Sequence, residues 1–299
     1  MNMFGDVTTG QVWRGSTAVG AGRAVSKVPQ ITAFFWIVKV LTTAQGEATS
    51  DYLVHRFNPV AAVGVAALVL AVSLILQFRV RRYVAWVYWL AVVMVAVFGT
   101  MVADGVHITL GVPYAVSTIV FAVVLAVIFV AWYATEKTLS IHSIYTRRRE
   151  AFYWVTVMAT FALGTAAGDM TAATLGLGYL ASGILFAVVI AIPAIGYWRL
   201  GLNSVVAFWF AYIVTRPLGA SFADWLGVPP SHGLGLGRGP VALGLTFVII
   251  GFVWYLAVTR RDVDRQFAGR RPKRARHRRK HARQERWPGA RVNLHGGVS

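Results

Sequence analysis

The sequence predicts an all-α transmembrane protein: an eight-helix bundle built from four tandem, parallel helical-hairpin repeats, with the odd-numbered helices around a polar centre. Two observations predict this fold. The 299-residue chain is 57% hydrophobic and only 13% charged, whereas a soluble domain is nearer half apolar and a quarter charged. In addition, one motif recurs four times, at intervals that each contain two long apolar segments.

Eight apolar segments are long enough to cross a bilayer, which takes roughly 20 helical residues. Pro59, Pro113 and Pro240 open the second, fourth and eighth segments, where a missing N–H group costs nothing. We expect the spans near residues 30–52, 59–79, 83–105, 112–134, 150–171, 177–198, 203–225 and 240–259. The preceding residues lack the features of a cleaved signal peptide, so we expect the first span to be retained.

The chain therefore divides into a polar N-terminal segment, residues 1–29, an eight-span membrane domain, residues 30–259, and a basic tail, residues 260–299. Two spans per repeat restore the direction of the chain, so the repeats are parallel and not inverted. Within the membrane domain the repeats are expected at 30–82, 83–148, 149–200 and 201–259.

The first span of each repeat carries a Trp, followed ten residues later by a Gly and five residues after that by an Asp. The second span of each repeat is almost free of ionisable groups. The four motif copies are Trp36/Gly46/Asp51, Trp89/Gly99/Asp104, Trp154/Gly164/Asp169 and Trp209/Gly219/Asp224.

Four tandem two-span repeats with a Trp in each first span resemble a bacterial family of integral membrane proteins described only as a repeat of unknown function. The resemblance covers about residues 30–259 and leaves out both ends of the chain. It implies the multi-pass architecture and no particular activity.

The ionisable residues of the odd spans should share one side of their helices with the Trp. At about 100° per residue, Trp, Asp, Lys39, Glu47 and Arg216 fall within an arc of about 120°. Charged groups in a bilayer face the protein interior or a water-filled cavity, because exposure to lipid is costly. We therefore expect the odd spans to surround a polar axis, with the even spans between them and lipid.

Lys39, Glu47 and Arg216 break the symmetry of the repeat. Along the helix Arg216 and Glu47 differ by a rise of about 6 Å when each is counted from its own Trp, which two long side chains can cover. We predict an Arg216–Glu47 pair, with Lys39 nearer the Trp residues. The pair either fixes which helices meet or belongs to a proton or ion relay.

The four Asp residues stand near the C-terminal ends of their helices, where the helix dipole disfavours a carboxylate. Three readings are open. The carboxylates form a ring that attracts or coordinates a cation at the mouth of a pathway, they accept bonds from backbone N–H groups and brace the repeat, or they lie in water.

The roles of the Trp and Gly residues of the motif can also be interpreted from the sequence, and for the Trp residues three interpretations are open. The Trp residues belong to an aromatic belt at the membrane surface, pack in the interior, or stack on a ligand. The Gly residues are typical of close helix–helix approach in membranes.

Three histidines, His55, His107 and His232, follow motif Asp residues in the connections on the same side. Asp together with His suits a divalent metal such as Mn, Fe or Zn, so a metal site is one hypothesis for them. Solvated loop histidines are the alternative. The chain has no cysteine, which excludes thiolate chemistry, and we expect no cofactor.

The net charge of +18 lies mostly in the tail, which carries the run RRPKRARHRRKHARQER and should be disordered. We expect the tail to contact anionic lipid head groups. Contact with nucleic acid is disfavoured because aromatic residues hardly interleave with the charges. The basic connections and tail lie on one side, so the positive-inside rule places both termini in the cytoplasm of a cell whose inner membrane holds the protein.

These features favour a transporter or channel-like protein for a small cation or a proton-coupled solute. The alternative is a membrane scaffold or sensor whose buried charges are structural. An enzyme is not expected, since the sequence lacks a Ser/His/Asp order, a Gly-rich nucleotide loop and an H-E-x-x-H motif.

Overall fold

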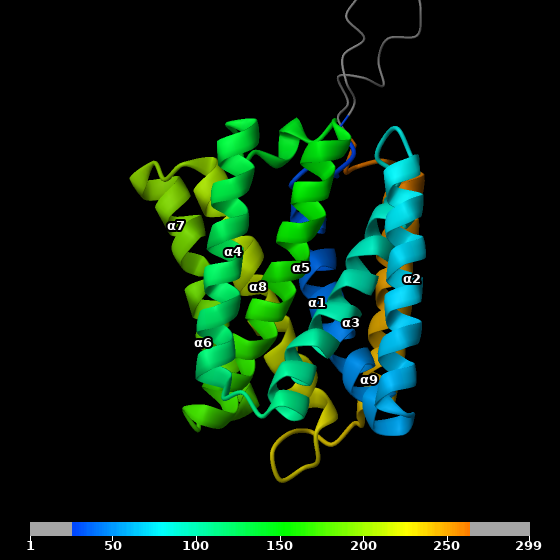
Figure 1. The fold of residues 1–299 in the computed structure, drawn as a ribbon, viewed down its shortest axis with the longest axis vertical. Helices are drawn as coiled ribbons and strands as arrows, with labels where there is room; N and C mark the ends of the chain where they lie inside the picture. Colours follow the sequence, from blue (N-terminus) through cyan, green and yellow to red (C-terminus); the bar gives the residue numbers. More distant parts are fainter. Residues whose placement is uncertain (1–25, 264–299) are drawn as a thin grey trace, which may run out of the picture.

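A computed structural model describes residues 26–263 of the chain, and within that range all regular structure is helical. Figure 1 shows the helices running roughly along one common direction. They are α1 (Ala33–Arg56), α2 (Pro59–Arg79), α3 (Ala85–Leu110), α4 (Tyr114–Glu136), α5 (Arg147–Asp169), α6 (Gly178–Val189), α7 (Ala191–Leu200), α8 (Ser204–Gly227) and α9 (Arg238–Thr259), with a 3-10 turn η1 (Ile141–Ser143) and a π-helical turn η2 (Met170–Thr174).

Eight crossings result, because α6 and α7 together make one. Pro193 has no N–H group to donate to the carbonyl of Val189, and the helix breaks nearby at Ile190. Seven of the crossings are long and apolar enough to span a membrane. The exception is α1, which carries several ionisable residues within 24 residues. The predicted all-α transmembrane bundle is confirmed.

The first helices of the four repeats, α1, α3, α5 and α8, form a closed ring at the centre. Each packs against the next, and α8 packs against α1 to complete the circle. In their most apolar stretches α3, α5 and α8 are 61–67% buried, whereas α2, α4, α6 with α7, and α9 are only 17–28% buried. The second helix of each repeat therefore forms an outer layer, as expected from its lack of charge.

The outer helices do not pack mainly against the first helix of their own repeat. Instead α2 lies on α3, α4 on α5, α6 and α7 on α8, and α9 on α1. Each repeat thus supplies a central helix and the cover for the next repeat's central helix. This interlocking is an addition to the predicted hairpin, and it makes every repeat depend on its neighbour.

The motif glycines are the points where neighbouring central helices approach most closely. A Cβ added to any of them would fall 2.0–2.7 Å from an atom of the next helix, so no larger residue fits without a shift. The predicted role in close helix approach is confirmed. The contacts are Gly46 on Ala96, Gly99 on Phe161, Gly164 on Arg216 and Gly219 on Thr43.

We call the end of the bundle that holds the four motif Trp residues the Trp end, and the opposite end the Asp end. The segments just before α1 and just after α9 lie together across the Trp end. Lys27 forms a buried 2.5 Å ion pair with Glu150, and the Gln30 amide donates to the carbonyl of Asp262 at 2.9 Å. The last residues of the predicted polar segment 1–29 are therefore packed against the bundle.

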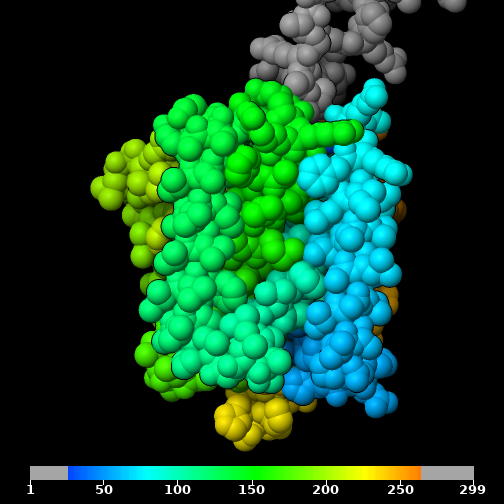
Figure 2. All heavy atoms as spheres, in the orientation of Figure 1, coloured from blue at the N-terminus to red at the C-terminus, as the bar shows by residue number. Residues whose placement is uncertain are grey.

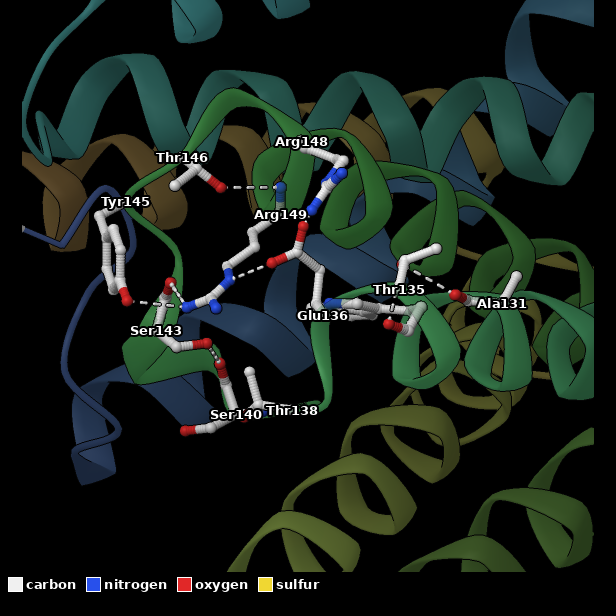
Figure 3. A network of polar contacts seen from close by, with 11 residues as sticks. Ala131, Thr135, Glu136, Thr138, Ser140, Ser143, Tyr145, Thr146, Arg148 and Arg149 are labelled. Atoms are coloured by element: carbon white, nitrogen blue, oxygen red, sulfur yellow. Dashed lines mark hydrogen bonds and ion pairs between the residues drawn. The ribbon is translucent and has the colours of Figure 1, made fainter.

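Asp262 accepts a hydrogen bond from the Tyr83 hydroxyl at the same end. Burial raises the pKa of the Asp262 carboxyl, and the Tyr83 hydrogen bond partly offsets that rise. Figure 3 shows a second polar cluster there, in which Glu136 at the end of α4 accepts from Arg148 and Arg149 at the start of α5. Arg149 also donates to the Tyr145 hydroxyl at 2.9 Å.

Candidate functional site

The ring of central helices encloses a stack of four layers, each made of one residue from every repeat. The layers stand 3, 7, 11 and 15 residues after the motif Trp, so successive layers are about 6 Å apart along the helix. We call this stack the polar axis. From the Trp end to the Asp end the layers are Lys39/Val92/Val157/Tyr212, Thr43/Ala96/Phe161/Arg216, Glu47/Thr100/Thr165/Ala220 and Asp51/Asp104/Asp169/Asp224.

Arg216 joins the central helices in the middle of the axis. Its guanidinium donates to Glu47 at 2.6 Å and to the Thr43 carbonyl at 3.0 Å, both on α1. It also donates to the Thr100 hydroxyl on α3 and, at 2.6 Å, to the Thr165 hydroxyl on α5. Gly164 makes room for this side chain, since a Cβ there would lie 2.3 Å from the Arg216 Cγ. We call Arg216, Glu47, Thr100 and Thr165 the Arg216 cluster.

The Arg216 cluster confirms the predicted pair and adds two partners. Glu47, Thr100 and Thr165 occupy the same position in the first three repeats, so a single guanidinium from the fourth repeat meets the equivalent residue of all the others. Arg216 and Thr100 are 0% exposed and Glu47 is 3% exposed. Protein atoms therefore surround the Arg216 side chain on all sides.

Lys39 lies on the Trp side of the Arg216 cluster, as predicted. Its ammonium stands 4.1 Å from the ring centroids of both Phe161 and Tyr212, a cation–π arrangement. Among residues 26–263 it has no hydrogen-bond partner, although the residue is only 1% exposed. A buried ammonium is rare in a membrane protein because burying its charge is costly, and such a group usually has a function.

Carboxylates gather on the other side of the Arg216 cluster. Oxygens of Glu47, Asp51 and Asp104 all lie within 4.8 Å of one another. Asp224 occupies the same layer of the axis as Asp51 and Asp104 and is 8% exposed. Arg238, at the start of α9, pairs with Asp51 at 2.7 Å. We call Glu47 and the four motif Asp residues the acidic cluster.

The acidic cluster is not explained by local bracing of the backbone. Among the hydrogen bonds of the described residues, none joins a motif Asp carboxylate to a backbone N–H group, which was one of the three readings. Of the five carboxylates only two form ion pairs among the described residues, Glu47 with Arg216 and Asp51 with Arg238. The remaining negative charge would be offset by bound cations or protons.

The three histidines lie at the Asp end but are engaged locally. His55 Nδ1 is 2.7 Å from the Asp51 carbonyl, and His107 Nδ1 is 2.7 Å from the Val112 carbonyl. His232 Nδ1 is 2.8 Å from the Ser231 hydroxyl. The close carboxylate group of Glu47, Asp51 and Asp104 contains no histidine. A metal-binding role for the histidines stays a prediction, whereas the carboxylates could hold a hard cation by themselves.

The motif Trp residues pack in the interior, so the aromatic-belt reading is wrong for three of them. Trp89, Trp154 and Trp209 are 1–4% exposed, and Trp209 Nε1 donates to the Leu139 carbonyl at 2.9 Å. Together with neighbouring Phe and Tyr rings they fill the Trp end of the axis with tilted and edge-on aromatic pairs. Trp36 alone among the four is partly exposed.

A family model described as "Repeat of Unknown Function (DUF347)" matches four sections of the chain, residues 34–83, 87–138, 152–202 and 207–262. The chain belongs to this family. Each matched section begins just before a motif Trp and contains the Gly and the Asp, so the DUF347 repeat coincides with one central helix and one outer helix. Neither curated proteins nor solved structures gave a match.

Some site residues escaped sequence reasoning. Thr100 and Thr165 could have been found, because they occupy the position of Glu47 in the next two DUF347 repeats. The Asp51–Arg238 pair had no such signal, since Arg238 follows a long Gly- and Pro-rich connection whose path the sequence does not define. That connection folds back on α8 through bonds such as Leu234 N–H to the Trp225 carbonyl at 2.7 Å.

Proposed function

We propose that this protein is a membrane transporter or channel-like protein for a small cation or a proton-coupled solute, and not an enzyme. The pathway runs along the polar axis. The acidic cluster collects the cation at the Asp end, and the Arg216 cluster closes the path beyond it.

The observation that carries the proposal is the acidic cluster together with its incomplete pairing. Three carboxylates approach within 4.8 Å at the end of an axis shared by four repeats. Asp224 is buried there with no hydrogen-bond or ion-pair partner among the described residues. Rings of carboxylates in a low-dielectric surrounding select cations, and hard cations take several carboxylate oxygens at once.

The Arg216 cluster has the properties of a closed barrier. Passage beyond the acidic cluster requires that the guanidinium leave Glu47, Thr100 and Thr165, and a cation or proton on Glu47 competes for the same oxygen. Binding at the Asp end and opening of the barrier would then be coupled through one carboxylate. Lys39 lies next along the axis and provides a second positive charge that must be neutralised or moved before a cation passes.

The orientation in the membrane belongs to the proposal too. The described basic residues concentrate at the Trp end, which favours a cytoplasmic Trp end and an inner-membrane location. The Asp end would then face outward. The basic run that we expect to contact anionic lipid head groups lies in residues 264–299, outside the described part of the chain. The Trp-end residues concerned are Arg79, Arg81, Arg82, Lys137, Arg147, Arg148, Arg149 and Arg199.

The test is ion flux in proteoliposomes. Asp104→Asn, Asp169→Asn and Asp224→Asn are each expected to reduce proton or Mn²⁺ uptake strongly while the protein stays folded. Glu136→Gln removes a carboxylate at the Trp end, away from the axis, and should leave uptake unchanged. Unaltered uptake in all three Asn variants would refute the proposal.

A second candidate function is a non-transport scaffold or sensor. The Arg216 cluster favours it, because a fully buried guanidinium bonded to three helices is also what a structural cross-brace requires. This candidate predicts that the Asn variants change thermal stability and that wild-type vesicles show no uptake above empty ones.

A further inference from the structure

A lateral groove of about 620 Å³ opens between α1, α7 and α8 near the Trp end. Its floor is formed by Trp36 and Val40 of α1 and by Ala207 and Ala211 of α8, and its wall by Pro193 and Tyr197 of α7. The volume falls within the range of about 300–1,000 Å³ that is usual for ligand pockets. The lining is largely apolar, and the groove lies outside the polar axis.

The groove breaks the pattern of the other three repeat junctions. At the junction of α5 and α8, Trp132 of α4 is 0% exposed and packs edge-on against Trp209 at 5.8 Å. At the junction of α3 and α5, Gln77 of α2 is 1% exposed and bonds to Glu150. At the junction of α1 and α3, Leu256 of α9 is 1% exposed. Each outer helix thus closes its junction with a buried side chain.

At the fourth junction, between α8 and α1, α7 does not cover the junction with a buried side chain. Tyr197 follows Trp154 by 43 residues, as Trp132 follows Trp89, yet Tyr197 is 50% exposed. The next residue, Trp198, is 76% exposed. The break between α6 and α7 lets α7 lean away from the bundle, which Figures 1 and 2 show as a helix standing out at the upper left. This also explains why Trp36 is the least buried motif Trp.

We propose that the lateral groove binds an anionic phospholipid of the leaflet at the Trp end, with one acyl chain in the groove and the head group at its rim. The groove opens sideways from membrane-spanning helices, so it faces the bilayer. Its apolar floor suits a hydrocarbon chain. His142 lines the groove, and Arg199 in the last turn of α7 directly follows the lining residue Trp198, so a basic residue at the basic end of the bundle is available to a phosphate at the rim.

The position of the groove links the lipid to the junction that closes the ring. Thr215, which also lines the groove, accepts a hydrogen bond at its carbonyl from Thr43 at 3.1 Å, and Arg216 is the next residue. A chain in the groove would therefore rest against both helices that meet beside the Arg216 cluster. The lipid site is independent of whether the axis carries ions.

The experiment fills the groove and counts bound lipid. The full chain would be purified with phosphatidylglycerol or phosphatidylcholine, and retained lipid measured by native mass spectrometry. Ala211→Trp, and separately Ala207→Trp, place an indole in the groove and should lower the retained phosphatidylglycerol to the amount bound outside the groove. Ala131→Trp puts the same side chain on the exposed face of α4 and should retain it. Since all three keep the basic residues after 263, lipid bound there cancels from the comparison.

Arg199→Gln tests the head group without filling the groove. It should weaken phosphatidylglycerol binding by about fivefold, the worth of one basic residue near an anionic surface, and leave phosphatidylcholine unaffected. Equal lipid retention in the groove-filling variants and in Ala131→Trp would overturn the proposal. So would a change of Ala211→Trp from oligomer to monomer with lipid retention intact, because the groove would then be an interface between two copies of the chain.

Discussion

Arg216 can lie in the middle of a membrane domain because both terminal nitrogens of its guanidinium meet acceptors, although Nε has no hydrogen-bond partner among the described residues. Glu47 neutralises the charge and shares the Nη2 group with the Thr100 and Thr165 hydroxyls, while the Thr43 carbonyl accepts from Nη1. Hydrogen bonds to charged groups are stronger than neutral ones, and stronger again in a low dielectric. The same arrangement makes the loss of either charged partner costly, since the other would remain buried alone.

Arg216→Met should lower the free energy of unfolding by about 3–5 kcal/mol, because Glu47 is left buried without a counter-charge. The double variant Arg216→Met/Glu47→Met should recover most of that loss, since an apolar pair of similar volume replaces the ion pair. Thermal unfolding in detergent measures both. A double variant less stable than the single one would contradict the account.

The pair was predictable from the sequence, whereas much of its surroundings was not. Charged residues must share the inward side of their helices, and the rise between Glu47 and Arg216 left them within reach. Whether the Asp carboxylates bind a cation, accept bonds from backbone N–H groups or lie in water depended on the positions of those N–H groups and of Arg238. Those positions are set by the folding of the connections, and no repeat pattern encodes them.

At the scale of the helix, the glycines determine how the ring closes. Gly46 lies against Ala96, and an added Cβ would fall 2.4 Å from the Ala96 Cβ and 2.9 Å from its carbonyl carbon. Backbone atoms cannot move aside as a flexible side chain can, so the two helices would have to separate. Overpacking of this kind typically costs about 1–3 kcal/mol.

Gly46→Ala is therefore expected to destabilise the bundle by about 1–3 kcal/mol. Gly105→Ala on α3 is the matched control, because nothing lies within 4 Å of the added Cβ. It should be neutral, or stabilising by up to about 1 kcal/mol, since Ala is the better helix former. Chemical or thermal denaturation in the same detergent compares the two, and equal effects would show that the close approach at Gly46 is unimportant.

The helices themselves were predictable, but their partners were not. Apolar length and the absence of charge identified the outer helices correctly. That α2 lies on α3 and α4 on α5, and not mainly on the first helix of its own repeat, follows from side-chain fit across the bundle. Interior packing of Trp89, Trp154 and Trp209 has the same cause: aromatic residues of other helices pack against them, and a residue's distance from the span end could not reveal this.

At the scale of the whole molecule, four similar repeats form a ring whose chemistry is not four-fold. Three repeats contribute Glu47, Thr100 and Thr165 at one level, and the fourth contributes Arg216 one level away. Only one repeat has a lysine in the layer nearest the Trp end, and only one has a broken outer helix. Four identical repeats would form a symmetric axis. These differences instead place a barrier at one level of the axis and a lateral groove at one of the four repeat junctions.

The central claim is that water and cations reach the acidic cluster from one side and stop at the Arg216 cluster. The natural absence of cysteine allows this to be measured by reaction of single cysteines with a membrane-impermeant thiol reagent. On one helix, Asp104→Cys should react from the Asp-end side and Thr100→Cys should not, since Thr100 is 0% exposed. Thr100→Cys should become reactive when Arg216→Gln is added. Equal reactivity at both positions, or protection of both whatever residue stands at 216, would contradict the account.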